Sequence, residues 1–336
     1  MRYKGEFITL DGEVLIGELI IEDKIYFEEC NVKPEYVFTP TFFNAHTHLG
    51  DSIAKDPDFM NLEQLVGPSG FKFKVLSSAS DEELIDGIKK SIEYALSTGT
   101  STILDFREGG IKGFNILKKA DEMNICLPLT RPSNLEEAEE LAKLSFGFGM
   151  SSVRDHNFEF LEEVRRIAKR EGIIFAIHAG EKDNKDVEDA LTLEPDLLVH
   201  MNRADVHQLK RAMDEDIPIV SCIRSNAFFG LLNVENYRIL LEYEKWLIGT
   251  DNVMIAKPSM LEEMHFASFI LRNDKEIYKA SVRGFELFDI KIGIVIFHRR
   301  KNLYRSMNII SSIVRRVGIE DIERVIVNRT INFNIF

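Results

Sequence analysis

The 336-residue chain lacks long apolar runs. No apolar stretch approaches the roughly 18 residues of a membrane-spanning helix, which excludes a protein built from such helices. The first 14 residues mix charged and apolar side chains and lack the continuous apolar core of a secretory signal. We therefore expect a cytoplasmic protein that does not associate with membranes.

Cysteine is scarce as well. The three cysteines, Cys30, Cys126 and Cys222, are far apart in the sequence, and none belongs to a Cys-x-x-Cys pair. This spacing argues against a disulfide framework and against a thiolate metal site. Each cysteine lies in or beside an apolar segment, so we expect small buried residues in a reducing compartment.

The chain has fewer basic than acidic residues, with 42 Lys and Arg against 55 Asp and Glu. The net charge of -13 argues against general affinity for nucleic-acid phosphates, which requires clustered cations. From Asp289 onward, however, nine Lys and Arg stand against four Asp and Glu. This basic segment is interpreted as a solvated face or as a contact with an acidic neighbour in a homo-oligomer, ahead of a nucleic-acid site.

Predicted helices and strands alternate regularly along most of the chain. A helix over 80–96 begins with the capping pair Ser80 and Glu83 and ends near Gly99, and further helices are predicted at 114–120, 134–143, 155–170, near 187, at 204–214 and at 233–243. Short apolar strand candidates lie at 37–45, 101–106, 125–129, 144–150, 173–177, 197–199, 217–222 and 246–249. Eight strands separated mostly by helices predict an α/β protein with a (β/α)8 barrel.

The terminal segments differ from this pattern. Residues 1–29 contain short alternating strands with an Asp11-Gly12 turn, and strands are also predicted at 292–297 and 325–328. We expect the two ends to pair into one small β domain. The predicted division is 1–36 and 289–336 for the two parts of the small domain and 37–288 for the barrel.

Two histidines, His46 and His48, follow the first predicted barrel strand. On a strand the i and i+2 side chains share a face, so both imidazoles can reach one metal ion, whereas on a helix they would point apart. A lone histidine is more often a structural residue. A pair supplies only two of the three protein ligands that a catalytic zinc-type site needs.

The barrel prediction shows where further ligands should lie, because catalytic residues of such barrels sit at the carboxyl ends of the strands. The fifth, sixth and eighth predicted strands deliver His178, His200 and Asp251. Each residue alone could be a core histidine or a turn aspartate, but independent structural residues have no reason to share these strand ends. The register therefore predicts a metal site. The other histidines, His156, His207, His265 and His298, are interpreted as structural or exposed.

At these residues the chain resembles the amidohydrolase superfamily, in the branch of cytosine, guanine and S-adenosylhomocysteine deaminases and chlorohydrolases. The resemblance implies that His46, His48, His178 and Asp251 hold one divalent metal and that His200 lies beside the metal-bound water. It is carried by Asn44-Ala45-His46-Thr47-His48, His178-Ala179-Gly180-Glu181, His200, Arg224-Ser225-Asn226, Gly249-Thr250-Asp251 and 260–264.

Binuclear members of this superfamily need a bridging ligand, typically a carboxylated lysine, at the end of the fourth strand. Here the strand at 144–150 ends without Lys or Glu, and Asp155 beyond it is interpreted as a helix N-cap. We therefore expect a single ion. Zinc is the leading candidate, with Fe or Mn as alternatives, because three histidines and a carboxylate accept several divalent ions.

Glu181 indicates the reaction. A carboxylate three residues beyond a ligand histidine can reach the open coordination position and hand a proton to a ring nitrogen. The function predicted is a hydrolase of carbon-nitrogen bonds other than peptide bonds, of the cyclic amidine deaminase type. Hydroxide held by the metal would attack a purine, pyrimidine, pterin or nucleoside, with His200 and Asp251 orienting and deprotonating the water. The alternative is a solvated loop glutamate beside Lys182 and Asp183.

The sequence identifies fewer features for substrate recognition than for metal binding. Arg131, Arg224 and Asn226 follow the third and seventh strands and could bind a phosphate, carboxylate or ring carbonyl. The two arginines could equally pair with Glu108 or other loop acids. The stretch between His48 and Ser80 is compact, which leaves nucleoside specificity open. Two alternatives remain: a cyclic amide hydrolase or chlorohydrolase with the same mononuclear site, and a catalytically silent barrel.

Overall fold

The computed structural model describes residues 1–67 and 69–327. Within them, no helix combines the length and the apolar character needed to cross a bilayer. The chain divides into two compact units. One comprises Met1–Phe43, Tyr94–Ser101 and the chain from Ser259 onward, and the other comprises Asn44–Glu93 and Thr102–Pro258.

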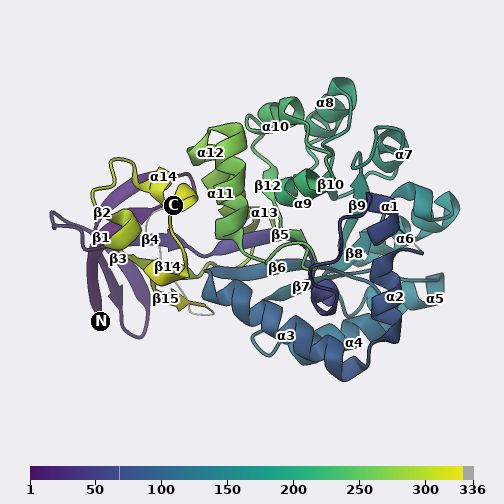
Figure 1. Ribbon diagram of the computed structural model, residues 1–336, viewed down its shortest axis with the longest axis horizontal. Helices are drawn as coiled ribbons and strands as arrows, with labels where there is room; N and C mark the ends of the chain where they lie inside the picture. The colour runs from purple at the N-terminus through teal and green to yellow at the C-terminus, as the bar shows by residue number, and fades with distance from the viewer. Residues whose placement is uncertain (68, 328–336) are drawn as a thin grey trace. The chain divides into compact units, whose positions relative to one another are not determined.

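Parallel strands form the centre of the barrel (Figure 1). Their order in the sheet is β12-β11-β10-β9-β8-β7-β6-β5-β13. The strands are β5 (Phe42–His48), β6 (Thr100–Arg107), β7 (Cys126–Thr130), β8 (Gly147–Met150), β9 (Ile174–Ala179), β10 (Leu197–His200), β11 (Ile219–Ser221), β12 (Trp246–Ile248) and β13 (Asp251–Asn252).

A single segment of chain closes this sheet. Trp246–Ile248 pairs with β11, whereas Asp251–Asn252 pairs in parallel with Thr47 and His48 of β5. Only Gly249 and Thr250 separate β12 from β13, so the eighth strand joins the seventh to the first. The (β/α)8 barrel expected from the sequence is confirmed.

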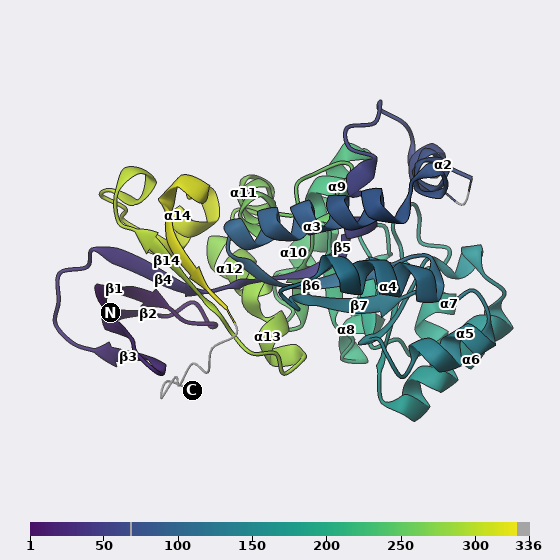
Figure 2. The same ribbon diagram turned by 90° about the horizontal axis from the view of Figure 1, so that it is seen from below.

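Helices follow the strands of the barrel, and α4 packs on β7 while α6 packs on β8 and β9 (Figures 1 and 2). Asn134 and Asn157 accept hydrogen bonds at the starts of α5 and α6. The helices are α3 (Asp81–Ser97), α4 (Gly110–Ala120), α5 (Leu135–Leu141), η2 (Val153–Asp155), α6 (Phe158–Glu171), α7 (Val187–Thr192), α8 (Val206–Asp214), α9 (Ile223–Phe228) and α10 (Val234–Leu240).

The expected N-cap at Asp155 is wrong. Asp155 ends the short helix η2, and Asn157 caps α6 by accepting from the N–H of Phe160. Two residues suited to capping stand two positions apart in Asp155-His156-Asn157, and the sequence pattern does not distinguish them. His156 also lies outside α6 and shares a hydrogen bond with Ser151.

Between the first two barrel strands the chain forms a short cover. It consists of η1 (Leu49–Ile53), α1 (Leu62–Val66) and α2 (Phe71–Ser78). Leu65 packs into a small apolar cluster with Ala54 and Met254, and Phe59 stacks on Phe228. These contacts hold α1 and α2 on the rest of their compact unit.

The terminal segments form a mixed six-stranded sheet with the order β15-β14-β4-β1-β2-β3, which confirms the small β domain. Strands β1 and β4 run parallel, and the other neighbouring strands are antiparallel. The strands are β1 (Arg2–Ile8), β2 (Val14–Ile21), β3 (Ile25–Glu29), β4 (Tyr36–Pro40), β14 (Ile294–His298) and β15 (Ile322–Ile326). Of the strand predicted at 325–328, Asn328 lies outside the described residues.

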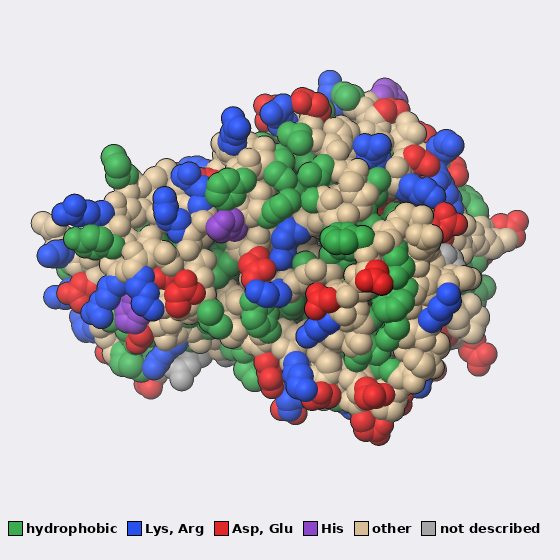
Figure 3. Space-filling model, viewed as in Figure 1, with side chains coloured by type: hydrophobic (Ala, Val, Ile, Leu, Met, Phe, Trp, Pro, Cys, Tyr) green, Lys and Arg blue, Asp and Glu red, His purple; other side chains and the backbone are tan. Residues whose placement is uncertain are grey.

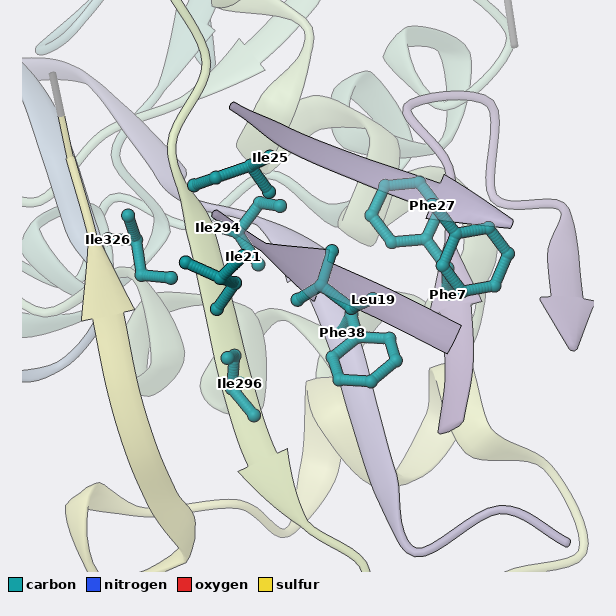
Figure 4. Close-up of a cluster of buried hydrophobic side chains, with 9 residues drawn as sticks. All are labelled: Phe7, Leu19, Ile21, Ile25, Phe27, Phe38, Ile294, Ile296 and Ile326. Carbon is teal, nitrogen blue, oxygen red and sulfur yellow. The ribbon is translucent and has the colours of Figure 1, made fainter. Parts of the chain in front are cut away.

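Alternating side chains of these strands build a separate core (Figure 4). Phe7, Leu19 and Phe38 come from three different strands, and Ile294 and Ile296 from the far end of the chain. Burial of such side chains contributes about 1.5–3 kcal/mol each, so the two ends of the chain stabilise one another. The same compact unit contains α11 (Met260–Leu271), α12 (Asp274–Val282), α13 (Gly284–Leu287), η3 (Lys301–Leu303), α14 (Ile309–Arg315) and η4 (Ile319–Asp321).

Two basic side chains of the C-terminal segment have acidic partners within this unit. Arg299 pairs with Glu6, and Arg315 Nε lies 2.9 Å from Asp274 Oδ2. On the face shown in Figure 3, Lys and Arg are interspersed with Asp and Glu. Among the cysteines, Cys126 and Cys222 are buried as expected, but Cys30 is exposed, so the expectation of burial is wrong there.

Candidate active site

Four histidines and one aspartate converge at the carboxyl ends of the barrel strands. Nitrogen and oxygen atoms of His46, His48 and Asp251 lie within 4.8 Å of one another, as do those of His46, His178 and His200. All five come from strand ends, because a parallel barrel directs the ends of its strands to one face. The structure therefore brings together the histidines and the aspartate that the sequence pattern selected.

The shortest contacts centre on His46. Its Nε2 lies 3.2 Å from Asp251 Oδ1 and 3.3 Å from His178 Nε2. His48 Nε2 lies 3.7 Å from the same Asp251 oxygen. Three imidazole nitrogens and a carboxylate oxygen thus face one small volume.

Backbone carbonyls fix the tautomers of two histidines. His178 Nδ1 lies 2.8 Å from the carbonyl oxygen of Met150, and His48 Nδ1 lies 3.1 Å from that of Phe106. A carbonyl only accepts, so each Nδ1 carries the hydrogen. Each Nε2 therefore presents a lone pair to the cluster, which is the form that ligates a metal.

Burial also keeps these rings neutral. It lowers the pKa of His46, His178 and His200, and it lowers that of His48 to about 3. For Asp251, burial opposes ionisation, but the hydrogen bond with His46 and the nearby His200 and His48 together outweigh it and hold the pKa well below the usual range. Neutral imidazoles turned toward an ionised carboxylate form a donor set that fits a divalent cation.

Asp251 is held from two sides. Ser225 Oγ donates to Asp251 Oδ2 at 2.5 Å, and Thr47 Oγ1 donates to the Asp251 carbonyl at 2.9 Å. Asp251 and His200 have φ angles of 57° and 78°, in the left-handed region that non-glycine residues rarely adopt. Such strain persists where surrounding contacts impose it, and it often marks functional residues.

Glu181 lies at the edge of this cluster. Its Oε1 is 3.5 Å from His200 Nε2, and its side chain is 19% exposed. Burial raises the pKa of Glu181 well above the usual range, and the charges of Asp251 and Asp186 raise it further. These surroundings favour the protonated form of the carboxyl group, from which it can donate a proton.

A cavity of about 330 Å³ opens over the cluster, a volume near the lower end of small-molecule sites. Arg131 lines it, and among the described residues this guanidinium makes one hydrogen bond, from Nε to the carbonyl oxygen of Gly149, and no ion pair. Further lining residues include Leu62, Glu63, Lys72, Glu108, Asp155 and Glu181.

The other two candidates for substrate binding lie elsewhere. Arg224 Nη2 donates to the carbonyl oxygen of Lys257, and Asn226 Nδ2 donates to the hydroxyl of Tyr237. Neither belongs to the described lining of the cavity. The Asn226 side chain opposes the lowering of the His200 pKa, which places it beside the histidine.

Sequence reasoning missed a charged group beside His48. Glu108 was considered there only as a partner for arginines. Its Oε1 lies 2.9 Å from His48 Nδ1 and accepts from Lys72 Nζ at 2.5 Å. Burial opposes ionisation of Glu108, but Lys72 and His48 hold its pKa well below the usual range. A signal existed, because Glu108 directly follows the second barrel strand. No comparable signal in the sequence pointed to Lys72, which lies on α2.

Comparisons with known proteins identify related chains. The amidohydrolase family matches residues 37–295. A protein of Archaeoglobus fulgidus that is provisionally named an aminohydrolase is 46% identical over 325 residues, which cover 97% of this chain and 96% of that protein. The chain belongs to the amidohydrolase family and is therefore a hydrolase. Its buried His and Asp groups could hold a metal.

Two solved structures show the same fold. A zinc-containing adenosine deaminase from Xanthomonas campestris superimposes with a TM-score of 0.79 at 14% identity, covering 96% of this chain and 90% of that chain. A triazine hydrolase variant superimposes with a TM-score of 0.81 at 14% identity, covering 97% and 93%. At these identities the likeness concerns the fold.

Proposed function

We propose that this protein is a metal-dependent aminohydrolase that releases ammonia from an amino-substituted aromatic N-heterocycle such as a purine, pyrimidine, pterin or nucleoside. The observation that carries the proposal is the position of Glu181, whose carboxyl group, with its raised pKa, lies 3.5 Å from His200 at the edge of the cluster. Hydrolysis of an amino-bearing ring requires such a proton donor for the ring nitrogen.

His46, His48, His178 and Asp251 would hold a single divalent ion, with zinc as the leading candidate and Fe or Mn as alternatives. When bound, the ion supplies a Lewis acid that makes water a better nucleophile near neutral pH. The end of β8 supports one ion rather than two, because Met150 contributes its backbone carbonyl to His178 and no lysine or carboxylate side chain stands at this strand end.

Side chains of the protein carry out the proton transfers of the proposed reaction. His200 and Asp251 orient the attacking water and accept its proton. The water oxygen bonds to the amino-bearing carbon while Glu181 protonates the adjacent ring nitrogen. The hydroxyl proton of this adduct passes to Glu181, which delivers it to the amino nitrogen; the carbon-nitrogen bond breaks, ammonia leaves, and the proton held by His200 or Asp251 restores Glu181. Neutral His200 and ionised Asp251 have the charge states that proton acceptance requires.

Arg131 is the proposed recognition residue of the cavity. Its Nη atoms are uncommitted among the described contacts, and a guanidinium can donate two parallel hydrogen bonds to a ring carbonyl or a carboxylate. Arg224 and Asn226 have less support for this role, because they lie outside the described lining of the cavity.

Metal analysis of the purified protein followed by an ammonia-release screen over amino-heterocycles tests this function. Glu181→Gln should retain the metal and lose about 100-fold or more in turnover, because glutamine keeps the shape and removes the proton. Asp183→Asn is the matched control, since Asp183 lies in the same loop and pairs with exposed Arg154.

Two results would redirect the proposal. An active enzyme that opens cyclic amides or releases halide but frees no ammonia would point to the rival hydrolase reaction. A protein that binds no stoichiometric metal and stays inactive after supplementation with Zn, Fe or Mn would point to a catalytically silent barrel.

A further inference from the structure

Glu108 makes a direct contact with His48 on the side away from the cluster. His48 Nδ1 lies 2.9 Å from Glu108 Oε1 and 3.1 Å from the carbonyl oxygen of Phe106. Because both neighbours accept, they fix the hydrogen on Nδ1 and turn Nε2 toward Asp251. A carboxylate behind a ligand histidine orients the ring and increases the basicity of the ligating nitrogen.

Two buried cations hold the Glu108 carboxylate in this position. Lys72 Nζ donates to Oε1 at 2.5 Å, and Arg107 Nη2 donates to Oε2 at 3.1 Å. Lys72, Arg107 and Glu108 are all less than a tenth exposed. In such surroundings an ion pair is weakly screened, and its geometry is tightly defined.

Lys72 reaches this carboxylate from the cover of the cavity. It is a residue of α2, and its Nζ also lies 3.2 Å from Asp51 Oδ1 in the helix η1 that follows His48. One ammonium group thus joins α2 both to η1, which directly follows His48, and to Glu108. Helices α1 and α2 are also held by the small apolar cluster around Leu65 and by the contact of Lys182 with Glu63 of α1.

We propose that Glu108 is a positioning residue for His48 and that Lys72 sets the orientation of Glu108. Through these two residues, the position of α2 affects the affinity of the metal centre. The inference rests on the metal centre of the proposed function and not on the identity of the substrate. Without Lys72, the carboxylate is free to turn toward Arg107, and His48 Nδ1 keeps only the Phe106 carbonyl as a fixed partner.

A double-mutant cycle tests this coupling with Zn²⁺ as the probe. Affinity is measured by competition with a chromophoric chelator, and the absorption spectrum of the Co²⁺-substituted protein reports ligand geometry. Glu108→Gln and Lys72→Met are each expected to weaken Zn²⁺ binding by about 10–100-fold and to shift the Co²⁺ spectrum. Lys74→Met, on the exposed side of the same helix, should leave both unchanged.

The decisive comparison is between the Zn²⁺ affinity of the Lys72→Met, Glu108→Gln double variant and that of Glu108→Gln alone. If Lys72 acts through Glu108, adding Lys72→Met to Glu108→Gln produces little further loss of Zn²⁺ affinity, because interacting residues are not additive. The double variant also removes both members of the ion pair and avoids leaving either charge buried alone, so it guards against a single variant that fails to fold.

The inference is overturned if both single variants bind Zn²⁺ within twofold of the wild type with an unchanged Co²⁺ spectrum, or if their losses are fully additive. If the single variants do not fold, wild-type affinity in the double variant overturns it. These outcomes are separate from the proposed reaction, because failure to release ammonia leaves the Zn²⁺ measurements unaffected.

Discussion

The side chain of Asn44 exchanges two hydrogen bonds with Thr250. Asn44 Oδ1 accepts from the backbone N–H of Thr250 at 3.0 Å, and Asn44 Nδ2 donates to Thr250 Oγ1 at 2.7 Å. Asn44 stands two residues before His46, and Thr250 directly precedes Asp251. A buried amide thus sets the distance between the first and eighth strands at the point where both supply candidate ligands.

Asn44→Ala should destabilise the fold and weaken the metal site together. The variant leaves the buried N–H of Thr250 without its partner, which costs about 1–3 kcal/mol of unfolding free energy. Urea unfolding and Zn²⁺ competition measure the two effects. As a control, Asn273→Ala removes the cap of α12 and should lower stability by about 1 kcal/mol without changing Zn²⁺ affinity. Unchanged Zn²⁺ affinity in Asn44→Ala would contradict the role given to this contact.

Ser225→Ala should lower Zn²⁺ affinity by about 10–100-fold, because Ser225 Oγ donates to the Asp251 oxygen that does not face His46. Ser221→Ala is the matched control. Ser221 is equally buried, but its hydroxyl accepts from Trp246 Nε1 and contacts no candidate ligand. Equal losses of Zn²⁺ affinity in the two variants would indicate a general packing effect instead.

Gly249→Ala should disrupt the site by steric collision. A Cβ at Gly249 would lie 2.6 Å from the backbone nitrogen of His46 and 2.8 Å from its carbonyl oxygen, and the backbone of β5 has no room to yield. We expect lower thermal stability and weakened Zn²⁺ binding. Gly172→Ala adds a Cβ with nothing within 4 Å at a φ of 67°, so it isolates the effect of backbone strain at about 1 kcal/mol. Wild-type behaviour of Gly249→Ala would refute the close approach.

Asp105→Asn should change how stability depends on pH. Burial raises the pKa of Asp105 to about 6, although Arg107 opposes the shift. A carboxyl group whose pKa is raised in the folded protein contributes most at low pH, below its ordinary pKa near 4, and loses that contribution as the pH rises through 6. The loss is about 3 kcal/mol for a shift of roughly two units.

The asparagine variant keeps an oxygen that can accept from the N–H of Leu49, as Asp105 Oδ1 does at 2.7 Å. We expect the wild type to lose free energy of unfolding relative to this variant between pH 4 and pH 7. Urea unfolding of both metal-free proteins at several pH values measures the difference. Parallel stability curves would show that Asp105 does not titrate in this range.

The sequence predicted the candidate ligands because their positions follow from strand periodicity. His46 and His48 lie two residues apart on one strand, and His178, His200 and Asp251 terminate strands with clear apolar runs. Asn134 and the pair Ser80 and Glu83 were predicted as helix caps, and the structure confirms both, because capping depends on neighbouring residues alone.

The contributions of Lys72 and Ser225 could not be predicted in this way. Lys72 meets Glu108 across 36 positions, and Ser225 meets Asp251 across 26, through placements that depend on how α2 and α9 pack. Periodicity identifies which face a residue occupies and not which distant side chain it meets. The left-handed φ of His200 and Asp251 likewise has no local signature, because neither residue is a glycine.

The pairing of β13 with β5 also determines when the candidate metal site can form during synthesis of the chain. His46 and Asp251 are 205 positions apart, so a growing chain holds its first candidate ligands long before the last one emerges. Only a chain whose eight strands have all paired in register brings the proposed ligands His46 and Asp251 together. In the proposed metal-bound protein, metal occupancy would therefore report that the barrel has closed, because a chain truncated before Asp251 lacks one ligand.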